Sequence, residues 1–230
     1  MEEIVFVELP LEIIVNILEL LSIKDLITLC SVNRELREII KNVRLPHMIC
    51  LKKWKDEKLI NIVNNYNFIN FNIFWSSITD VGLASLSDCY TVDLSGCNLV
   101  TDEGIKALKN CHIVNLSHCD KVTDKGIKAL KNCHIVNLSY CDKVTDEGIK
   151  ALKNCHTVDL SYCDKVTDEG IKALKNCHTV DISYCDEVTD EGIKALKNCN
   201  TVNLSRCNLI TDEGIKALKN FTLLILVVAN

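Results

Sequence analysis

The stretch "VTDEGIKALKNCHTVDLSYCDK", residues 144–165, is followed at once by a near copy of itself. A Thr-Asp pair with a Gly two residues after the Asp marks each copy, and the copies follow one another every 22 residues. One short unit repeated in register is typical of a stacked array, in which each unit packs only against its neighbours. Seven such units begin at Thr79, Thr101, Thr123, Thr145, Thr167, Thr189 and Thr211.

Half of each unit has the pattern of a short strand. Within residues 155–163, the middle alternates apolar and polar side chains, which is the period of a β-strand. We therefore expect the apolar side chains to face a core and the residues between them to face solvent. The apolar positions are the first, fourth, sixth and ninth of this frame: Cys155, Val158, Leu160 and Cys163.

The other half of the unit has the signals of a short helix. Thr145 is a favourable N-cap, and Val144 and Ile149 have the spacing of a hydrophobic staple around it. Asp146 suits the positive end of the helix dipole, and Lys153 suits the negative end. Because one strand and one short helix cannot bury both apolar faces alone, the units must stack.

This unit resembles a leucine-rich repeat, since its strand follows the L-x-x-L-x-L-x-x-C frame. The C-x-x-V-T-D-E-G-I turn resembles the cysteine-containing subfamily, although the unit is a few residues shorter and Cys155 replaces the first leucine of the frame. The resemblance implies an α/β fold: a right-handed solenoid with a parallel concave sheet and short outer helices. It covers residues 68–230, as seven repeats and a closing strand.

The two ends of the repeat array are degenerate. We expect a first strand with Phe68, Phe71, Ile73 and Ser76 on the frame, and an eighth strand with Phe221, Leu224, Leu226 and Ala229. That last strand, "TLLILVV", has no further unit to pair with. An unpaired edge strand favours association, so we expect self-association through it.

The first 42 residues repeat nothing and are rich in leucine and isoleucine at helical spacing, with a break at Ser22. Residues 9–37 resemble the F-box, because Leu-Pro, Glu-Ile-Ile, Ile-Leu, Lys-Asp-Leu and Asn-Arg-Glu-Leu-Arg stand in that motif's order. The sequence departs from the motif at Leu36, where an aromatic residue is common. The resemblance implies an all-α module over residues 1–42 that docks on a Skp-family adaptor, and we expect contacts from Leu9, Pro10, Ile13, Ile14, Ile17, Leu18, Leu21 and Leu26.

Residues 43–67 connect the two parts and are expected to form a helical linker that packs on the first repeat. Pro46 suits the start of a helix.

The 14 cysteines include twelve in two series of period 22, so the repeat itself places them. Adjacent Cys and His residues, such as Cys155 and His156, point to opposite faces of a strand and cannot bind one metal ion together. A ladder of equivalent ligands on stacked strands is the alternative, which metal analysis of the purified protein would reveal. No phosphate-binding loop or nucleophile motif is present, so we expect no catalytic residues, no bound metal and no cofactor.

Charge and hydropathy exclude several classes of partner. The chain has 26 basic and 31 acidic residues, and no Lys/Arg cluster stands beside aromatic residues, so we expect no nucleic-acid ligand. No apolar run reaches the roughly 18 residues of a membrane span, so we expect no membrane association. The first residues, "MEEIVFVELP", do not have the basic start of a secretory signal. We therefore expect reduced thiols and a cytoplasmic location, with the nucleus as an alternative.

The order of F-box and repeats implies a function. F-box proteins with leucine-rich repeats are substrate-receptor subunits of Skp-cullin-F-box ubiquitin ligases, in which the repeats bind the target protein. This chain would position a target without being an enzyme itself. The alternative is a leucine-rich-repeat scaffold or decoy that binds a partner without ubiquitination.

Target contacts are expected at the rim of the concave sheet, where the eighth position of the frame varies most. Tyrosine and arginine are favoured interface residues, and nearby aspartates would attract a basic or donor-rich partner. The alternative is that the rim tyrosines stack on one another and shield the sheet. The expected contacts are His118, Tyr140, Tyr162, Tyr184 and Arg206 on the rim, with Asp159 and Asp181 beside them.

Overall fold

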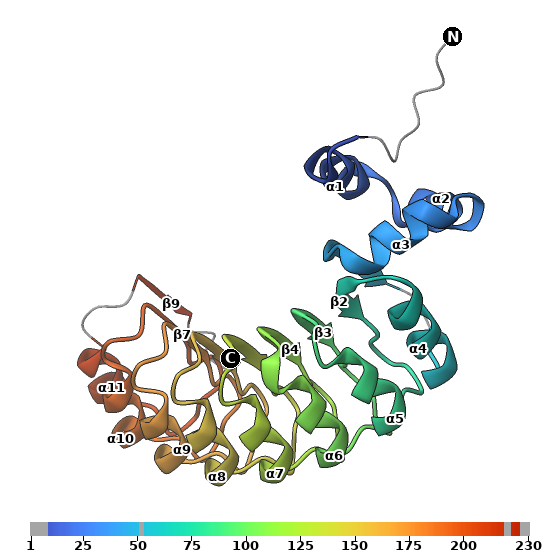
Figure 1. Cartoon of the computed structure of the whole chain (residues 1–230). Helices are drawn as coiled ribbons and strands as arrows, with labels where there is room; N and C mark the ends of the chain where they lie inside the picture. The colour runs from blue at the N-terminus through green and yellow to red at the C-terminus, as the bar shows by residue number, and fades with distance from the viewer. Residues whose placement is uncertain (1–8, 51–52, 219–221, 226–230) are drawn as a thin grey trace.

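The computed structural model of the chain describes residues 9–50, 53–218 and 222–225. A helical N-terminal module leads into a parallel sheet whose strands β1–β9 lie in the order of the sequence. Figure 1 shows the strands along the inner side of an arc and the short helices along its outer side. The predicted solenoid of parallel strands and short helices is confirmed.

Three helices form the N-terminal module: α1 (Leu11–Leu20), α2 (Ile23–Val32) and α3 (Arg34–Asn42). The expected break at Ser22 is confirmed, and Ser22 caps α2, because its side chain accepts a hydrogen bond from the backbone N–H of Asp25. A second break, which the sequence reading missed, lies at Asn33, whose side chain accepts from the backbone N–H of Leu36 at 2.9 Å. The buried residues of the module are Ile14, Leu18, Leu26, Cys30, Leu36 and Ile40.

The prediction of a wholly helical linker is wrong for residues 45–50. This segment is strand β1 (Leu45–Cys50), which pairs in parallel with β2 (Phe68–Asn72), and helix α4 (Asp56–Asn65) follows it. Leu45 and Ile49 are buried, so the segment adds to the core as a strand rather than as a helix begun at Pro46.

Residues 45–67 therefore form a degenerate unit of the solenoid, which begins one unit earlier than predicted. Trp54 takes the place of the buried cysteine at the ninth frame position, and its backbone N–H donates to the Ser76 hydroxyl at 3.0 Å. Lys53 before it has the left-handed backbone (φ 58°) that recurs one residue before this position in later units.

The remaining strands are three residues long, and from β3 to β8 each residue pairs with the equivalent residue 22 positions later. The middle residue of each strand from β3 to β8 is a buried valine that points into the core, as the alternation predicted. The strands are β3 (Thr91–Asp93), β4 (Ile113–Asn115), β5 (Ile135–Asn137), β6 (Thr157–Asp159), β7 (Thr179–Asp181), β8 (Thr201–Asn203) and β9 (Leu223–Ile225).

The outer helices are only one or two turns long. Thr145 caps its helix as predicted, and its hydroxyl accepts from the backbone N–H of Glu147. Most of the helices tighten into a 3₁₀ segment such as Lys150–Leu152, which shortens the unit. They are α5 (Asp80–Leu83), α6 (Asp102–Ile105), α7 (Asp124–Ile127), α8 (Asp146–Ile149), α9 (Asp168–Ala173), α10 (Asp190–Ile193) and α11 (Asp212–Ala217).

The core of the solenoid runs as a continuous column of apolar side chains and thiols. All twelve repeat cysteines are buried and unpaired. The Cys163 thiol donates to the carbonyl of Leu138 in the preceding unit at 3.1 Å. Burial raises the pKa of this thiol to about 12. These cysteines therefore pack as small apolar residues, as the repeat spacing predicted.

From α4 to α10, the Asp that begins each helix joins its unit to the next one. The Asp146 carboxylate accepts from both the backbone N–H and the hydroxyl of Thr167, each at 2.8 Å. A Cβ added at Gly170 would lie 2.5 Å from the same carboxylate, so glycine leaves room for the joint. Helix capping alone was the expected role of these aspartates, and this second role was missed. The same joint recurs at Asp56–Thr79, Asp80–Thr101, Asp102–Thr123, Asp124–Thr145, Asp168–Thr189 and Asp190–Thr211.

The two ends of the sheet agree with the predicted frame where they are described. The first-strand residues Phe68, Phe71, Ile73 and Ser76 are all buried. Strand β9 pairs with β8 and is the last described strand, with Leu224 partly buried. The other expected frame residues of this strand, Phe221, Leu226 and Ala229, lie outside the described residues. Self-association through this edge stays a prediction.

Candidate functional site

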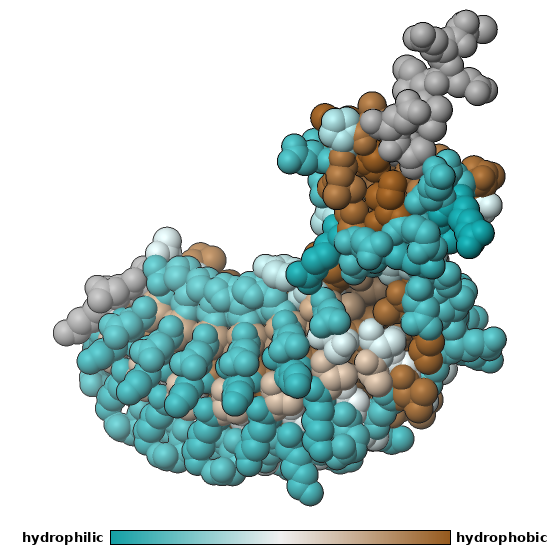
Figure 2. Space-filling model, in the orientation of Figure 1, coloured by the Kyte–Doolittle hydropathy of each residue, from teal (hydrophilic) through white to brown (hydrophobic). Residues whose placement is uncertain are grey.

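The helical module exposes large apolar side chains, whereas the solenoid surface is mostly hydrophilic (Figure 2). Leu20 is 87% exposed and Ile13 is 46% exposed. These two residues lie seven positions apart, which is about two helical turns, with the partly buried Ile17 between them. We call Ile13, Ile17 and Leu20 the outer α1 stripe. An apolar stripe of this kind on a small helical module is suited to a protein partner.

The structure divides the predicted adaptor contacts into three groups. Pro10 and Ile13 are exposed, and Leu9, Ile17 and Leu21 are partly buried. Ile14, Leu18 and Leu26 are buried in the core of the module, and their expected adaptor contacts stay a prediction. The exposed apolar residues that the prediction missed are Leu11, Leu20, Ile27 and Val32.

The spacing of apolar residues in the sequence did not indicate which side of α1 is exposed. The sequence of α1, "LEIIVNILEL", has apolar residues on several sides of the helix, so more than one stripe fits a core. Packing against strand β1 selects the side of Ile14 and Leu18 as the buried one.

The inner surface of the sheet carries a column of carboxylates and amides at the fifth frame position. Asp159 lies half-buried in it and accepts from the backbone N–H of Ser161 at 2.9 Å and from its hydroxyl at 2.7 Å. The other carboxylate oxygen accepts from Asn137 at 2.8 Å. Burial is the largest cause that raises the pKa of the Asp159 carboxyl, and the nearby Asp181 adds to it.

Asp181 repeats this arrangement one unit apart from Asp159. It accepts from the backbone N–H and hydroxyl of Ser183 at 2.9 and 2.7 Å, and from Asn203 at 2.8 Å. Both predicted aspartates therefore face the inner surface, but neighbouring side chains already hold their oxygens. A partner would therefore contact carboxylates that already accept hydrogen bonds from the chain, rather than isolated charges.

The predicted rim residues form a stack of rings at the ends of the strands, which we call the tyrosine ladder: His118, Tyr140, Tyr162 and Tyr184. Ring centroids lie 4.2 Å apart for His118–Tyr140 and 4.1 Å apart for both tyrosine pairs. Each of these residues has φ between 57° and 60°, a left-handed conformation that turns its side chain along the sheet. Stacking, which the sequence left as an alternative, is the observed geometry. The ring faces are covered, and the ring edges and hydroxyls remain for a partner.

The ends of the tyrosine ladder differ. Arg206 continues the column after Tyr184, also with positive φ. At the other end, Gly96 has φ 70°, and a Cβ there would lie 2.4 Å from the Trp75 ring. Glycine therefore leaves space for the indole, whose centroid lies 6.0 Å from His118.

A second stack, which sequence reasoning did not assign, lies at the beginning of the strands. We call it the histidine ladder: Tyr90, His112, His134, His156 and His178. Successive ring centroids lie 4.4–4.7 Å apart. The repeated Cys-His pair was its signal in the sequence. As predicted, the two residues face opposite ways, with Cys155 buried and His156 on the surface.

Among residues 9–50, 53–218 and 222–225, no group of three or more His, Cys, Asp or Glu side chains is arranged to hold a metal ion. In the same ranges, no helix is long and apolar enough to cross a membrane.

Comparison with protein families identifies both parts of the chain. The F-box domain matches residues 6–48, and the leucine-rich repeat matches residues 91–109, 109–131, 131–153, 156–175, 178–197 and 200–219. The repeat matches alone cover more than half of the chain. The chain therefore belongs to the leucine-rich-repeat proteins and carries an F-box domain before its repeats. No curated protein sequence matches it.

Solved structures share the fold at low sequence identity. A chain of the yeast Rad7–Elc1 complex is 18% identical with a TM-score of 0.61, and the match covers 76% of this chain and 53% of that one. This protein thus spans about half the length of that chain. The internalin C2 of Listeria monocytogenes is 20% identical with a TM-score of 0.62, covering 84% of both chains. An internalin F from the same species is 15% identical with a TM-score of 0.60, covering 84% of this chain and 64% of the other.

Proposed function

We propose that the chain is the substrate-recognition subunit of a Skp-cullin-F-box type ubiquitin ligase. The observation that carries this proposal is the outer α1 stripe, an exposed apolar surface on a module that matches the F-box domain. F-box domains bind Skp-type adaptors, and such a stripe needs a partner to remove it from water. The fold shared with a chain of the Rad7–Elc1 complex supports a role in a multi-protein assembly.

In this proposal the two parts of the chain bind different partners. The F-box module binds the adaptor and, through it, a cullin. The solenoid holds a target protein, and the partners supply the ubiquitin-transfer chemistry, because F-box and leucine-rich-repeat domains are typically binding modules. The assembly would act in the cytoplasm or the nucleus.

We place the target on the inner surface, along the tyrosine ladder from His118 to Arg206. The stacked rings present their edges and hydroxyls, and Tyr140 and Tyr184 are each 37% exposed. Asp159 and Asp181 lie on the adjacent column and would accept hydrogen bonds from a donor-rich partner. Tyrosine and arginine contribute strongly to protein interfaces when a partner desolvates them.

Capture of the adaptor tests the F-box half of the proposal. Tagged full-length protein expressed in cells should co-purify with a Skp-family adaptor and a cullin. The Leu9→Ala/Pro10→Ala variant should lose both while its repeats stay folded. Undiminished adaptor capture by this variant would contradict the assigned contacts. Failure of the wild type to capture any adaptor would leave a scaffold or decoy without a ligase role.

A matched pair of variants tests the target half. Changing Tyr140, Tyr162 and Tyr184 to Ala removes both rings and hydroxyls, whereas changing them to Phe keeps the stack. We expect the Ala variant to lose captured target proteins and the Phe variant to keep most of them. Identical captured sets from wild type and the Ala variant, with unchanged folding, would place recognition elsewhere.

A further inference from the structure

The solenoid carries a row of exposed lysines at the turns that lead from the outer helices into the strands. In the part of the chain that the structure describes, none of them forms an ion pair, unlike the helix-face lysines Lys150, Lys172 and Lys194, which each pair with a glutamate. The five lysines of the row are Lys109, Lys131, Lys153, Lys175 and Lys197.

The residues beside this row are neutral amides and aromatic rings. Each lysine is followed by an exposed asparagine, such as Asn154, and then by a buried cysteine and a residue of the histidine ladder or its continuation. The acidic residue in these columns is Asp88, in the first of the seven repeats. We call the lysine row, the asparagine row and the histidine ladder together the basic edge. Although the chain as a whole has a net charge of −5, the five lysines of this edge stand in line with neutral residues and rings on either side.

The lysines supply most of the charge of this edge at neutral pH. The pKa of His156 is lowered by burial and by its neighbours His178 and His134, and no carboxylate counteracts these effects. The stacked rings of the ladder form an aromatic wall beside the lysines.

The basic edge continues into two clefts where the solenoid meets the helical module. An open cleft of about 460 Å³ is lined by Arg44 and by the first residues of the asparagine column: Asn67, Asp88 and Asn110. Arg44 also donates to the carbonyl of Asp88 at 3.1 Å, which fixes its position on this edge.

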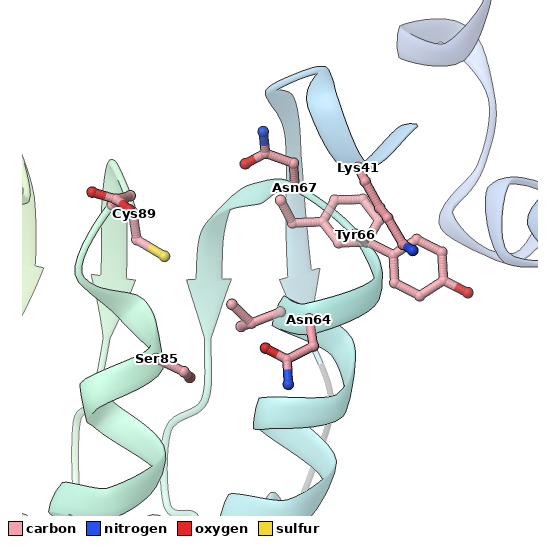
Figure 3. A pocket seen from close by; sticks show the side chains of 9 residues that line it. Lys41, Asn64, Tyr66, Asn67, Ser85 and Cys89 are labelled. Carbon is pink, nitrogen blue, oxygen red and sulfur yellow. The ribbon is translucent and has the colours of Figure 1, made fainter. Parts of the chain in front are cut away.

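The second cleft, of about 280 Å³, adds another cation and an apolar side. Figure 3 shows Lys41 beside the ring of Tyr66, with Asn64 and Ser85 reaching in from two neighbouring helices. Cations, amide donors and an aromatic surface thus lie at the start of the lysine row.

We propose that the basic edge is a docking surface for an acidic, extended segment of a protein partner. Neighbouring strands lie about 4.8 Å apart, so the five lysines extend over about 19 Å. An extended peptide covers about 3.3 Å per residue, so about six residues match this length. The proposal rests on the proposed function for the partner, which we take to be the target protein.

The geometry favours a peptide over a nucleic acid. Single-stranded nucleic acids bind by stacking their bases on open aromatic faces. In the histidine ladder each ring face is covered by the next ring, 4.4–4.7 Å away. Side-chain carboxylates need only the lysine charges and the amide donors, which are exposed.

Binding of labelled peptides to the full chain tests the proposal. The probe is a fluorescent peptide of about twelve residues in which Glu alternates with Ser, and its control has Gln at each Glu. Anisotropy is measured at low salt, about 50 mM, and again at high salt, where screening weakens exposed charges. The edge variant is Lys131→Gln/Lys153→Gln/Lys175→Gln. The matched control is Lys150→Gln/Lys172→Gln/Lys194→Gln, which removes the same charge from the outer helices.

We expect the edge variant to bind the Glu peptide at least about tenfold more weakly, and the control variant to change by less than about threefold. Equal losses of affinity in the two variants would mean that only the net charge of the chain matters, and would overturn the proposal. No binding of the Glu peptide by the wild type, or equal binding of the Gln peptide, would also overturn it. Stronger binding of an oligouridylate than of the Glu peptide would replace the protein partner with a nucleic acid. The edge variant changes only lysines of the repeats, so adaptor capture by the F-box module tests the proposed function separately.

Discussion

The helical module and the solenoid differ in how completely they bury their apolar side chains. The three helices of the module leave Leu20 and Val32 largely exposed, whereas Ile149 and Leu152 in a repeat are completely buried. A repeat reaches this burial because an equivalent unit covers each of its faces, with an Asp–Thr joint between them. The module has a neighbour on one side only. The difference indicates that the inner repeats bury their apolar side chains against one another, while the module retains an apolar surface for a partner.

The largest expected effect separates core from partner surface within one helix. Leu18→Ala should lower the free energy of unfolding of the module by about 2–5 kcal/mol, because it leaves a cavity in the core. Leu20→Ala, two residues away, should change it by less than about 0.5 kcal/mol, since this side chain is exposed. Denaturant unfolding of both full-length variants measures the contrast. Equal destabilisation by the two changes would mean that the buried side of α1 is wrongly assigned.

Thiol reactivity should also follow burial. Burial raises the pKa of Cys163 to about 12 and that of Cys155 to about 11, so few thiolates form in the folded repeats. Cys50, at the end of β1, is exposed. We expect an alkylating reagent to modify Cys50 about a hundredfold faster or more than the repeat cysteines, as followed by mass spectrometry. A Cys50→Ser variant is the control and should lose the fast reaction. Rapid labelling of most repeat cysteines would contradict the packed core.

A smaller effect is expected at the joints between repeats. Asp146→Ala leaves the half-buried backbone N–H of Thr167 without its acceptor and should cost about 1–3 kcal/mol. The neighbouring Glu147→Ala removes only an exposed ion pair with Lys150 and should cost much less. Thermal unfolding compares the two variants. If the Glu147 variant melts as low as the Asp146 variant, the joint does not stabilise the stack.

The smallest effect concerns pH. The pKa of His156 is lowered in the folded chain by burial and by its stacked neighbours, so folding favours the neutral ring. Its contribution to stability is present above its usual pKa of 6.5 and is lost as the pH falls through the lower folded value. Between pH 7.5 and 5.5, wild type should lose slightly more stability than a His156→Gln variant. A larger loss of stability in the variant than in the wild type would contradict the lowered pKa of His156.

Most of the solenoid could be predicted from the sequence because the same local pattern recurs in every repeat. The alternation around Val158 and the cap at Thr145 are local signals, and both are confirmed. Strand β1 was missed because it occurs once, contains Pro46, lacks the cysteine frame and pairs with an irregular register. Its role depends on a partner strand that its own sequence does not specify.

The candidate surfaces were predicted less completely, for two physical reasons. Apolar residues lie on several sides of α1, so spacing alone could not tell the core residue Leu18 from the exposed Leu20. The stacking of His156 on its neighbours and the bond from Asp146 to Thr167 depend on distances between units. Strand spacing makes such ladders possible, but the packing of neighbouring units decides which side chains meet.

The most direct test of the account is the affinity of the full chain for a purified Skp-family adaptor. Ile13→Asp/Leu20→Asp places charges on the outer α1 stripe without touching the buried residues of the module. Calorimetry should show wild-type binding that this variant weakens by at least about a hundredfold, which is about 2.7 kcal/mol, while thermal unfolding of the repeats stays unchanged. An adaptor that binds the variant as tightly as the wild type, or that does not bind the wild type, would contradict the central claim.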